Sequence, residues 1–254
     1  MKREFKRVAA VEKCFRILNL LAAAEKPMGV SEISRALTLN KSTVFNTVHT
    51  LCELRILETH SASKLWFGTD LYLLGKAAGR GSELIQTVHP FLQKINKETK
   101  LSAFLGIRSG QMAVLLDKID DAFDIKISSE VGMRLPLLVG AGGKALLSQL
   151  PDAEIDRILS VNKLRKFTPF TCVDKAAYRQ SILQVREEGI ALDREEYIEG
   201  VVAFAVPLKT QRKGLQAAIW AVGLKRQVTE ELVTELSELL KGIADEINLR
   251  FSLV

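Results

Sequence analysis

Apolar residues recur at helical spacing in the first part of the chain. Between residues 8 and 24 they fall every three or four positions, at Val8, Val11, Phe15, Leu18 and Leu21, which predicts an amphipathic helix. Two shorter helices are predicted next. Ser31 is a candidate N-cap for the first and Asn40 for the second, and Leu39 is placed to pack against Val44. Two short helices joined by a tight turn are typical of a helix-turn-helix.

The second of these short helices has two different faces. Val44, Val48 and Leu51 are spaced to pack in a core. The opposite face is polar without being uniformly charged, as expected of a surface that contacts base edges and phosphates. That face carries Ser42, Asn46, His49 and Glu53, flanked by Lys41, Thr43 and Phe45.

A predicted β-hairpin follows this helix directly. It consists of a strand around 56–59, a turn at 61–63 and a return strand at 64–67. A hairpin in this position is typical of the wing of a winged helix-turn-helix. Lys64 on the return strand is a candidate for contact with the minor groove or a phosphate, although a surface lysine is the alternative.

The remainder of the chain alternates strands and helices. Another helix is expected at 70–79, and Gly79 and Gly81 mark a candidate domain boundary. We therefore expect a DNA-binding domain over 1–69, a helical linker over 70–81 and a second domain over 82–254. The elements expected in that domain are a helix at about 82–100 kinked near Pro90, strands at 102–108, 111–118, 124–129, 200–208 and 214–224, and helices at about 142–149, 152–160, 175–188 and after Thr229. The last two strands are almost continuously apolar, so helices should cover both faces of the sheet.

Charge separates the two halves. Residues 1–80 hold 13 lysines and arginines against 7 acidic residues, whereas residues 81–254 hold 23 of each, so the formal net charge of +6 lies in the helix-turn-helix region. This favours a polyanionic partner for that region. No apolar run reaches membrane-spanning length and no signal peptide is recognisable, so a cytoplasmic protein is expected. The three cysteines are expected to be reduced thiols.

Motifs for catalysis or cofactor binding are not apparent. The glycines in GAGGKALL (residues 140–147) lack the spacing of a phosphate-binding P-loop and indicate a tight helix start with exposed N–H groups instead. No nucleophile elbow or metal-ligand spacing occurs, and none of the three histidines lies in the apolar runs of the second domain. We therefore expect neither an enzyme nor a bound cofactor or metal.

Several motifs together resemble the IclR family of bacterial transcriptional regulators. In the first half these are FRILNLL, VSEISRALTLNKSTVFNTVHTL and a wing ending WFG; in the second they are RLPLLVGAGGKALLSQL (residues 134–150), EEGIALDREEYIEGVVAFAVPL (187–208) and AAIWAVGL (217–224). The resemblance covers nearly the whole chain. It implies an α+β fold in which a winged helix-turn-helix is joined by a helical linker to a GAF-like effector-binding domain. It also implies a homodimer or dimer of dimers that binds double-stranded DNA at a promoter.

The family resemblance also implies an effector site in this chain, although several residues differ from the family pattern. Asp193 and the Ala141-Gly142-Gly143 turn match the family, whereas Ala203 replaces a position that is often polar, and Trp220 and Val222 replace small hydroxyl residues. Asn46 stands where a basic residue is frequent. The departures predict a crowded, apolar pocket for an organic acid with an apolar or aromatic body. The effector residues expected from this comparison are Leu135, Ala141, Gly142, Asp193, Val201, Ala203, Trp220 and Val222.

Three functional hypotheses follow. The first is a transcriptional regulator whose promoter binding is modulated by a small metabolite in the second domain. The second is a DNA-binding regulator whose sensor domain is ligand-free because Trp220 fills the pocket. The third, less favoured, is an enzyme built on the second domain.

Overall fold

The computed structural model describes residues 7–24, 26–80, 82–120, 129–210, 212 and 214–252. The chain divides into two compact units, Met1–Ser82 and Glu83–Val254. The helix expected to act as a linker is α4 (Thr69–Arg80), and it is grouped with the first unit. Within the described ranges, every helix is too short or too polar to cross a membrane.

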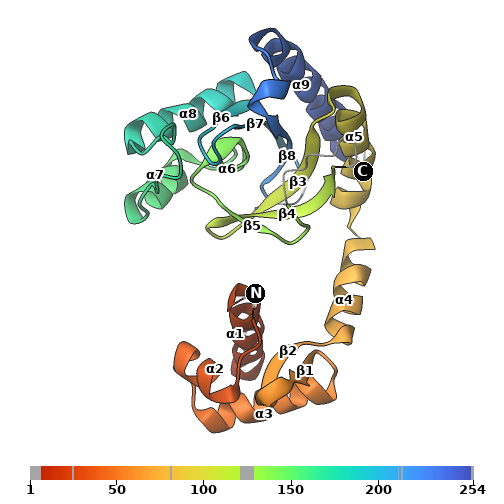
Figure 1. The fold of residues 1–254 in the computed structure, drawn as a ribbon, viewed down its shortest axis with the longest axis vertical. Helices are drawn as coiled ribbons and strands as arrows, with labels where there is room; N and C mark the ends of the chain where they lie inside the picture. The colour runs from red at the N-terminus through yellow and green to blue at the C-terminus, as the bar shows by residue number, and fades with distance from the viewer. Residues whose placement is uncertain are drawn as a thin grey trace, which may run out of the picture. The chain divides into compact units, whose positions relative to one another are not determined.

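The first unit is a three-helix bundle with a two-stranded hairpin, as Figure 1 shows at the red and orange end of the chain. It contains α1 (Ala9–Ala24), α2 (Val30–Leu37), α3 (Lys41–Glu53), β1 (Leu57–His60) and β2 (Lys64–Phe67). β1 and β2 pair antiparallel around a turn at Ser61–Ser63, and Met28 adds an isolated bridge to Leu65. The predicted winged helix-turn-helix is therefore present. Its core consists of Ile17, Leu21, Ile33, Val44, Val48, Leu51, Leu57 and Leu65.

The expected cap of the second helix was wrong, whereas the expected first helix is present as α1. Helix α2 begins at Val30 with Gly29 as its N-cap, so Ser31 lies inside the helix. The reason is Glu32, whose carboxylate Oε2 accepts a hydrogen bond from the Gly29 N–H at 2.6 Å and fixes the earlier start. Helix α1 turns Ile17 and Leu21 into the core, but Val8, Val11 and Phe15 are each more than half exposed. The apolar stripe expected on this helix therefore includes residues that the core of this chain does not bury.

The second unit is built on a six-stranded antiparallel sheet with strand order β5-β4-β3-β8-β7-β6. The strands are β3 (Ser102–Ser109), β4 (Met112–Ile119), β5 (Arg134–Pro136), β6 (Ala191–Arg194), β7 (Val201–Leu208) and β8 (Ala217–Leu224). β7 and β8 occupy the interior of the sheet and are buried on both faces, as their apolar sequences predict. The short edge strands β5 and β6 were not expected from sequence. The strand expected at 124–129 lies almost entirely outside the described residues.

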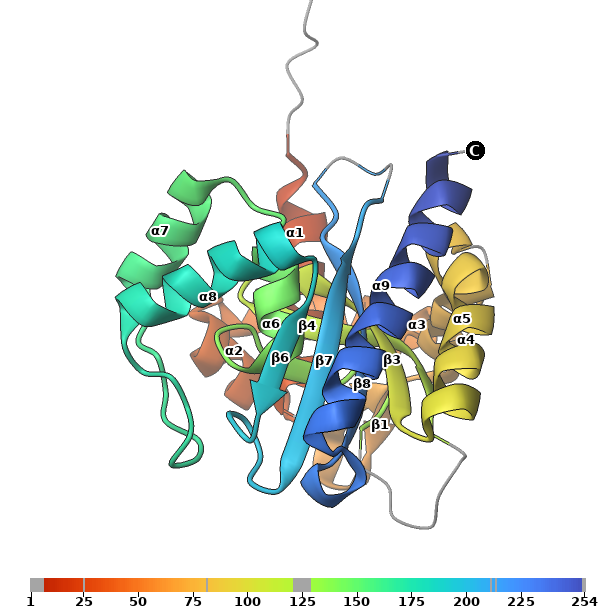
Figure 2. The same cartoon turned by 90° about the horizontal axis from the view of Figure 1, so that it is seen from above.

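Helices cover both faces of this sheet (Figures 1 and 2). One face packs against α5 (Glu83–Thr99), which continues through Pro90, and α9 (Glu230–Ser252). The other face packs against α6 (Gly140–Leu147), behind which lie α7 (Asp152–Val161) and α8 (Lys175–Glu188). Asp174 caps α8 by accepting a hydrogen bond from the Ala177 N–H, and Gly189 ends it in the left-handed region, as predicted.

Candidate nucleic-acid interface and ligand pocket

Helix α3 presents the polar face that its sequence predicts. Val44, Val48 and Leu51 are buried, whereas Lys41, Ser42, Phe45, Asn46 and His49 are exposed and Thr43 is half-buried. The first turn of α3 contains no acidic residue, and the Asn40 side chain makes no capping hydrogen bond. The amides at this end are therefore not satisfied by a side-chain cap, and they form an electropositive helix terminus beside Lys41.

Contacts along α3 fix some of these side chains. The Phe45 and His49 rings lie 5.6 Å apart, and His49 Nδ1 is 3.9 Å from a Glu53 oxygen. The Thr47 and Thr50 hydroxyls donate to the carbonyls of Thr43 and Asn46 one turn earlier. Within the described part of the chain, the side-chain amide of Asn46 makes no hydrogen bond. The donors and acceptors of the Asn46 side chain are therefore available to a base edge.

The wing lysine is held toward helix α2. Lys64 Nζ lies 4.0 Å from Glu32 Oε1, and the Lys64 side chain is 45% exposed. The pKa of the Glu32 carboxyl is lowered, first by the hydrogen bond from the Gly29 N–H and then by the charge of Lys64. Contact of Lys64 with a phosphate would have to compete with this weak ion pair.

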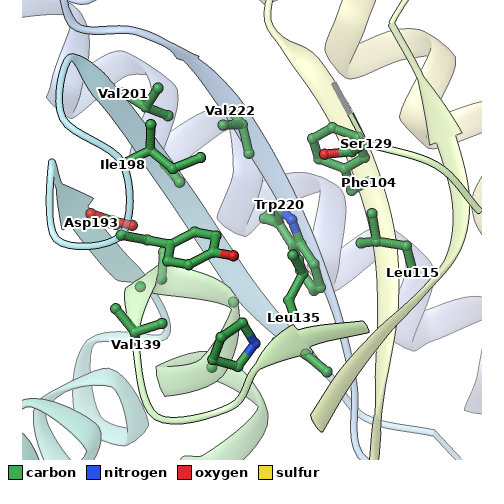
Figure 3. Close-up of a pocket in the computed structure, with 18 residues that line it drawn as sticks. Phe104, Leu115, Ser129, Leu135, Val139, Asp193, Ile198, Val201, Trp220 and Val222 are labelled. Carbon is green, nitrogen blue, oxygen red and sulfur yellow. The ribbon is translucent and has the colours of Figure 1, made fainter. Parts of the chain in front are cut away.

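A cavity of about 80 Å³ lies between helix α6 and the sheet of the second unit (Figure 3). All eight residues expected at the effector site line it. They come from β5, the start of α6, β6, β7 and β8, which are far apart in sequence. The cavity is several times larger than the roughly 10–15 Å³ that one water requires, but smaller than the roughly 300 Å³ at which small-molecule pockets usually begin.

Asp193 is the charged side chain among the described residues that line the cavity. Its Oδ1 accepts a hydrogen bond of 2.6 Å from the Glu196 N–H, and a Cβ added to Gly140 would lie 2.8 Å from its Oδ2. Gly140 also has φ of +72°, so this turn requires glycine on two counts. Burial raises the pKa of Asp193 to about 6, against the lowering effect of the hydrogen bond from Glu196. The carboxyl group is therefore poised to gain or lose a proton near neutral pH.

Trp220 forms one wall of the cavity and is 4% exposed. Its ring lies over two glycines: a Cβ on Gly106 would come within 2.2 Å of the indole, and one on Gly142 within 3.3 Å. Gly106 is on β3 and Gly142 is on α6, so the large ring occupies space that both elements leave free. Figure 3 shows Trp220 beside Leu135, on the opposite side of the cavity from Asp193. The indole narrows the cavity without closing it.

Sequence reasoning missed other residues that line the cavity. Tyr197 and Ile198 lie on the loop after β6, which offers no periodic pattern from which a wall could be inferred. Phe104, Ala113 and Leu115 lie on strands that were predicted, but the sequence did not indicate that these positions face a cavity. The other lining residues outside the eight expected ones are Ser129, Pro136, Val139, Gly140 and Gly143, of which Gly143 belongs to the turn that the family resemblance had indicated.

A buried ion pair lies next to the cavity. Lys144 on α6 is 6% exposed, and its Nζ donates to Glu196 Oε1 at 2.5 Å and to the Leu192 carbonyl at 3.2 Å. Glu196 Oε2 is buried and has no hydrogen-bond partner among the residues that the structure describes. The pair connects helix α6 to the loop that follows β6. Among the described residues no cluster of histidine, cysteine and carboxylate side chains is arranged to hold a metal ion, and all three cysteines are free thiols.

A winged helix-turn-helix with an exposed polar recognition face, together with an α/β unit that encloses a small cavity, defines a ligand-responsive DNA-binding protein. The family models agree. The IclR helix-turn-helix domain matches residues 10–61, and the bacterial transcriptional regulator IclR C-terminal domain matches residues 77–249. This chain belongs to the IclR family and is a DNA-binding transcriptional regulator.

Curated relatives and solved structures are similar over almost the full length. The HTH-type transcriptional repressor AllR of Escherichia coli (strain K12) is 28% identical over 94% of this chain and 89% of its own. An IclR transcriptional regulator from Alicyclobacillus acidocaldarius has a TM-score of 0.83 at 22% identity, covering 96% of this chain and 99% of its own. An IclR homolog from Microbacterium hydrocarbonoxydans complexed with 4-hydroxybenzoate has a TM-score of 0.79 at 21% identity, covering 96% and 100%. These two structures support the fold.

Proposed function

We propose that a small organic acid with an apolar or aromatic body binds in the cavity of the second unit and modulates promoter binding. The observation that carries this proposal is the lining: apolar on nearly every side, with Asp193 and the start of α6 at one end. A buried polar group needs a partner, so the polar end of the ligand would lie against Asp193 and the Ala141–Gly143 amides. The IclR homolog whose structure contains 4-hydroxybenzoate offers a precedent for an aromatic acid.

Calorimetry and thermal shift across a panel of acids test this proposal. Benzoate, 4-hydroxybenzoate and isovalerate should raise the melting temperature, whereas glycerate should not. Trp220→Ser should enlarge the cavity and broaden the range of acids that bind. Tight binding of glycerate by the unmodified protein would contradict an apolar ligand. If no panel member binds either protein, the hypothesis of a sensor filled by its own tryptophan is favoured instead.

Protonation of Asp193 gives the proposal a second test. A ligand carboxylate beside an ionised aspartate is repelled, so binding should raise the pKa of Asp193 further and take up a proton. The affinity for benzoate should fall as pH rises from 5 to 7.5. Asp193→Asn should remove most of that dependence. A pH-independent affinity in the unmodified protein would place the ligand carboxylate away from Asp193.

We propose that α3 is the DNA recognition helix and that Asn46 contacts a base edge. Lys41, Ser42 and Thr43 are proposed to contact phosphate. The proposed interface also includes Phe45, His49 and Lys64. Affinity should fall steeply with salt, by roughly 0.9 log unit per log unit of salt for each neutralised phosphate. Filter binding or fluorescence anisotropy at graded salt concentration measures the slope. An affinity that barely changes with salt would contradict phosphate contact.

The proposed assembly is a homodimer or dimer of dimers on a pseudo-palindromic site. Its support is the apolar surface left exposed in the first unit, on Val8, Val11 and Phe15 of α1 and on Tyr72, Leu73 and Leu74 of α4. Helix α4 has no buried residue, and a group of exposed apolar side chains is typical of an interaction surface. Phe15→Glu or Leu73→Glu should shift the sedimentation coefficient toward the monomer. An unchanged coefficient in both variants would place the interface elsewhere.

We propose that the protein acts in the cytoplasm and does not catalyse a reaction. His89 forms a 2.7 Å contact with Asp117, but neither residue lines the cavity. The described lining contains neither histidine nor cysteine, so a ligand there would meet neither the side chain most often used as a general base nor a thiol nucleophile. Mass spectrometry of benzoate after prolonged incubation with the protein should recover it unchanged.

A further inference from the structure

The loop Glu195–Gly200 is attached to its surroundings through Glu195 and Glu196, and a hydrogen bond from Gly200 to Glu195 closes it. Asp193 accepts a hydrogen bond from the Glu196 N–H. The Glu195 carboxylate accepts from the Gly200 N–H at 3.0 Å and pairs with Lys225. Glu195 has φ of +67° and Gly200 has φ of +76°, so the loop is bounded by two residues in the left-handed region. These attachments hold its backbone in one conformation.

Two threonines from a distant segment hold the same loop from the other side. Thr168 Oγ1 donates to the Glu195 carbonyl and Thr171 Oγ1 to the Glu196 carbonyl, each at 2.6 Å. Thr171 Oγ1 also accepts from the Thr168 N–H at 2.9 Å. Both threonines are buried, on the segment between α7 and α8. We name this pair, Thr168 and Thr171, the threonine clip.

The side chains in the middle of the loop face the cavity. Tyr197 and Ile198 both line it, and Ile198 is 44% exposed, so it lies where the cavity meets solvent. Figure 3 shows Ile198 directed toward Val222 and Trp220. Phe167, the residue before Thr168, packs edge-on against the Tyr197 ring at 5.1 Å. The segment that holds the loop backbone therefore also positions one of its cavity-lining side chains.

We propose that Tyr197 and Ile198 close the effector cavity and determine which acids fit, and that the threonine clip is the positioning element that holds them closed. The proposal rests on the proposed function in taking the cavity as the effector site. Its physical basis is size: about 80 Å³ accepts a small acid only, so an aromatic body requires these two side chains to move. Loosening the clip should make the closed conformation less populated.

Acrylamide quenching of Trp220 fluorescence tests the closure without any effector. The other tryptophan, Trp66, lies in the first unit and is replaced by Phe in every protein compared. The double variant Thr168→Val/Thr171→Val should raise the quenching constant about twofold or more, because each lost hydrogen bond favours local opening. Thr210→Val is the matched control, since its hydroxyl also donates to a backbone carbonyl, that of Leu215, away from the cavity.

A second variant separates closure from folding. Ile198→Ala removes exposed surface and breaks no hydrogen bond, so it should fold and should still raise quenching. If quenching is unchanged in Ile198→Ala and in the folded clip variant, or rises equally in Thr210→Val, the proposal is wrong. Stopped-flow binding of benzoate is the other arm, with association and dissociation both about tenfold faster in the clip variant. If benzoate does not bind the unmodified protein, this result counts against the proposed function. The quenching measurement then still tests whether Tyr197 and Ile198 close the cavity.

Discussion

The two units of this chain place their functional side chains in opposite environments. In the basic first unit, the candidate DNA-contacting residues stand exposed on one helix, α3, and their positions follow from the burial of Val44, Val48 and Leu51 on its other face. In the second unit, the candidate effector residues are drawn from five elements and surround a cavity. A surface site is therefore specified by local periodicity, whereas the cavity is specified by the fold as a whole.

The largest expected effect comes from crowding helix α6. A Cβ on Gly143 would lie 2.1 Å from the Leu137 carbonyl oxygen, a backbone atom that cannot move aside. Gly143→Ala should therefore destabilise the second unit by about 3 kcal/mol or more. Urea denaturation followed by circular dichroism measures this loss.

A helical glycine of the same unit provides the control for that prediction. Gly242 lies in α9, where an added Cβ meets nothing within 4 Å. Gly242→Ala should stabilise the protein by about 0.5–1 kcal/mol, because alanine restricts the unfolded chain more than glycine does. Equal effects of the two substitutions would show that α6 packs less tightly than described.

The next largest effect is expected at Asp193. Because its folded pKa is raised to about 6, the native state binds a proton more readily than the unfolded state, so stability is lost as pH rises from about 4 through 6. Asp193→Asn should abolish this loss and stabilise the protein at pH 7.5 by up to about 3 kcal/mol. Thermal unfolding at pH 4.5 and 7.5 provides the measurement. A variant that loses stability equally at both pH values would show that the carboxylate is needed for its hydrogen bonds rather than tolerated.

Intermediate effects are expected on α3, where two exposed residues should behave differently. Asn46→Ala should relax discrimination at one or two base pairs, each worth roughly 1–3 kcal/mol. Lys41→Ala should weaken binding to every sequence alike and reduce the salt slope by about one. Binding-site selection from a random DNA library, repeated for both variants, separates the two roles. An unchanged preferred site in Asn46→Ala would exclude base contact by that residue.

The smallest effect is expected at the wing. Glu32→Gln keeps an acceptor for the Gly29 N–H but removes the charge that attracts Lys64. DNA affinity should rise by about twofold at low salt, and the gain should disappear at high salt. In a Lys64→Met background the same substitution should have no effect. A gain that persists in this background would come from overall charge and not from Lys64.

The fold was largely predictable from the sequence, for physical reasons. Helices such as α3 and α8 carry both a periodic apolar face and recognisable ends, and the two central strands are long and continuously apolar. The edge strands β5 and β6 are three and four residues long, too short for a pattern to stand out. Ser31 was misassigned because a glycine followed by a glutamate at the third helical position competed with it for the cap.

The two candidate sites differed in how far the positions of their residues could be predicted from the sequence. On α3, one helical period was sufficient to place Asn46 and Lys41 on the exposed face. For the cavity, the eight expected residues came from resemblance to a family and not from spacing, and they do line one cavity. Tyr197, Ile198 and the threonine clip were missed because nothing in the sequence relates residues 168–171 to residues 195–198 before the chain folds.

Trp220 and the two glycines beneath it have a consequence for how this sensor could change its specificity. The indole, Gly106 and Gly142 lie on three different elements, and the indole ring occupies the space that side chains at the two glycine positions would need. Replacing the tryptophan alone leaves a cavity, whereas a Cβ on Gly106 alone would collide with the indole and one on Gly142 alone would make a tight contact with it at 3.3 Å. A shift to a different effector size, by natural drift or by biosensor engineering, is therefore expected to require paired substitutions at these positions, with the intermediate less stable than either end.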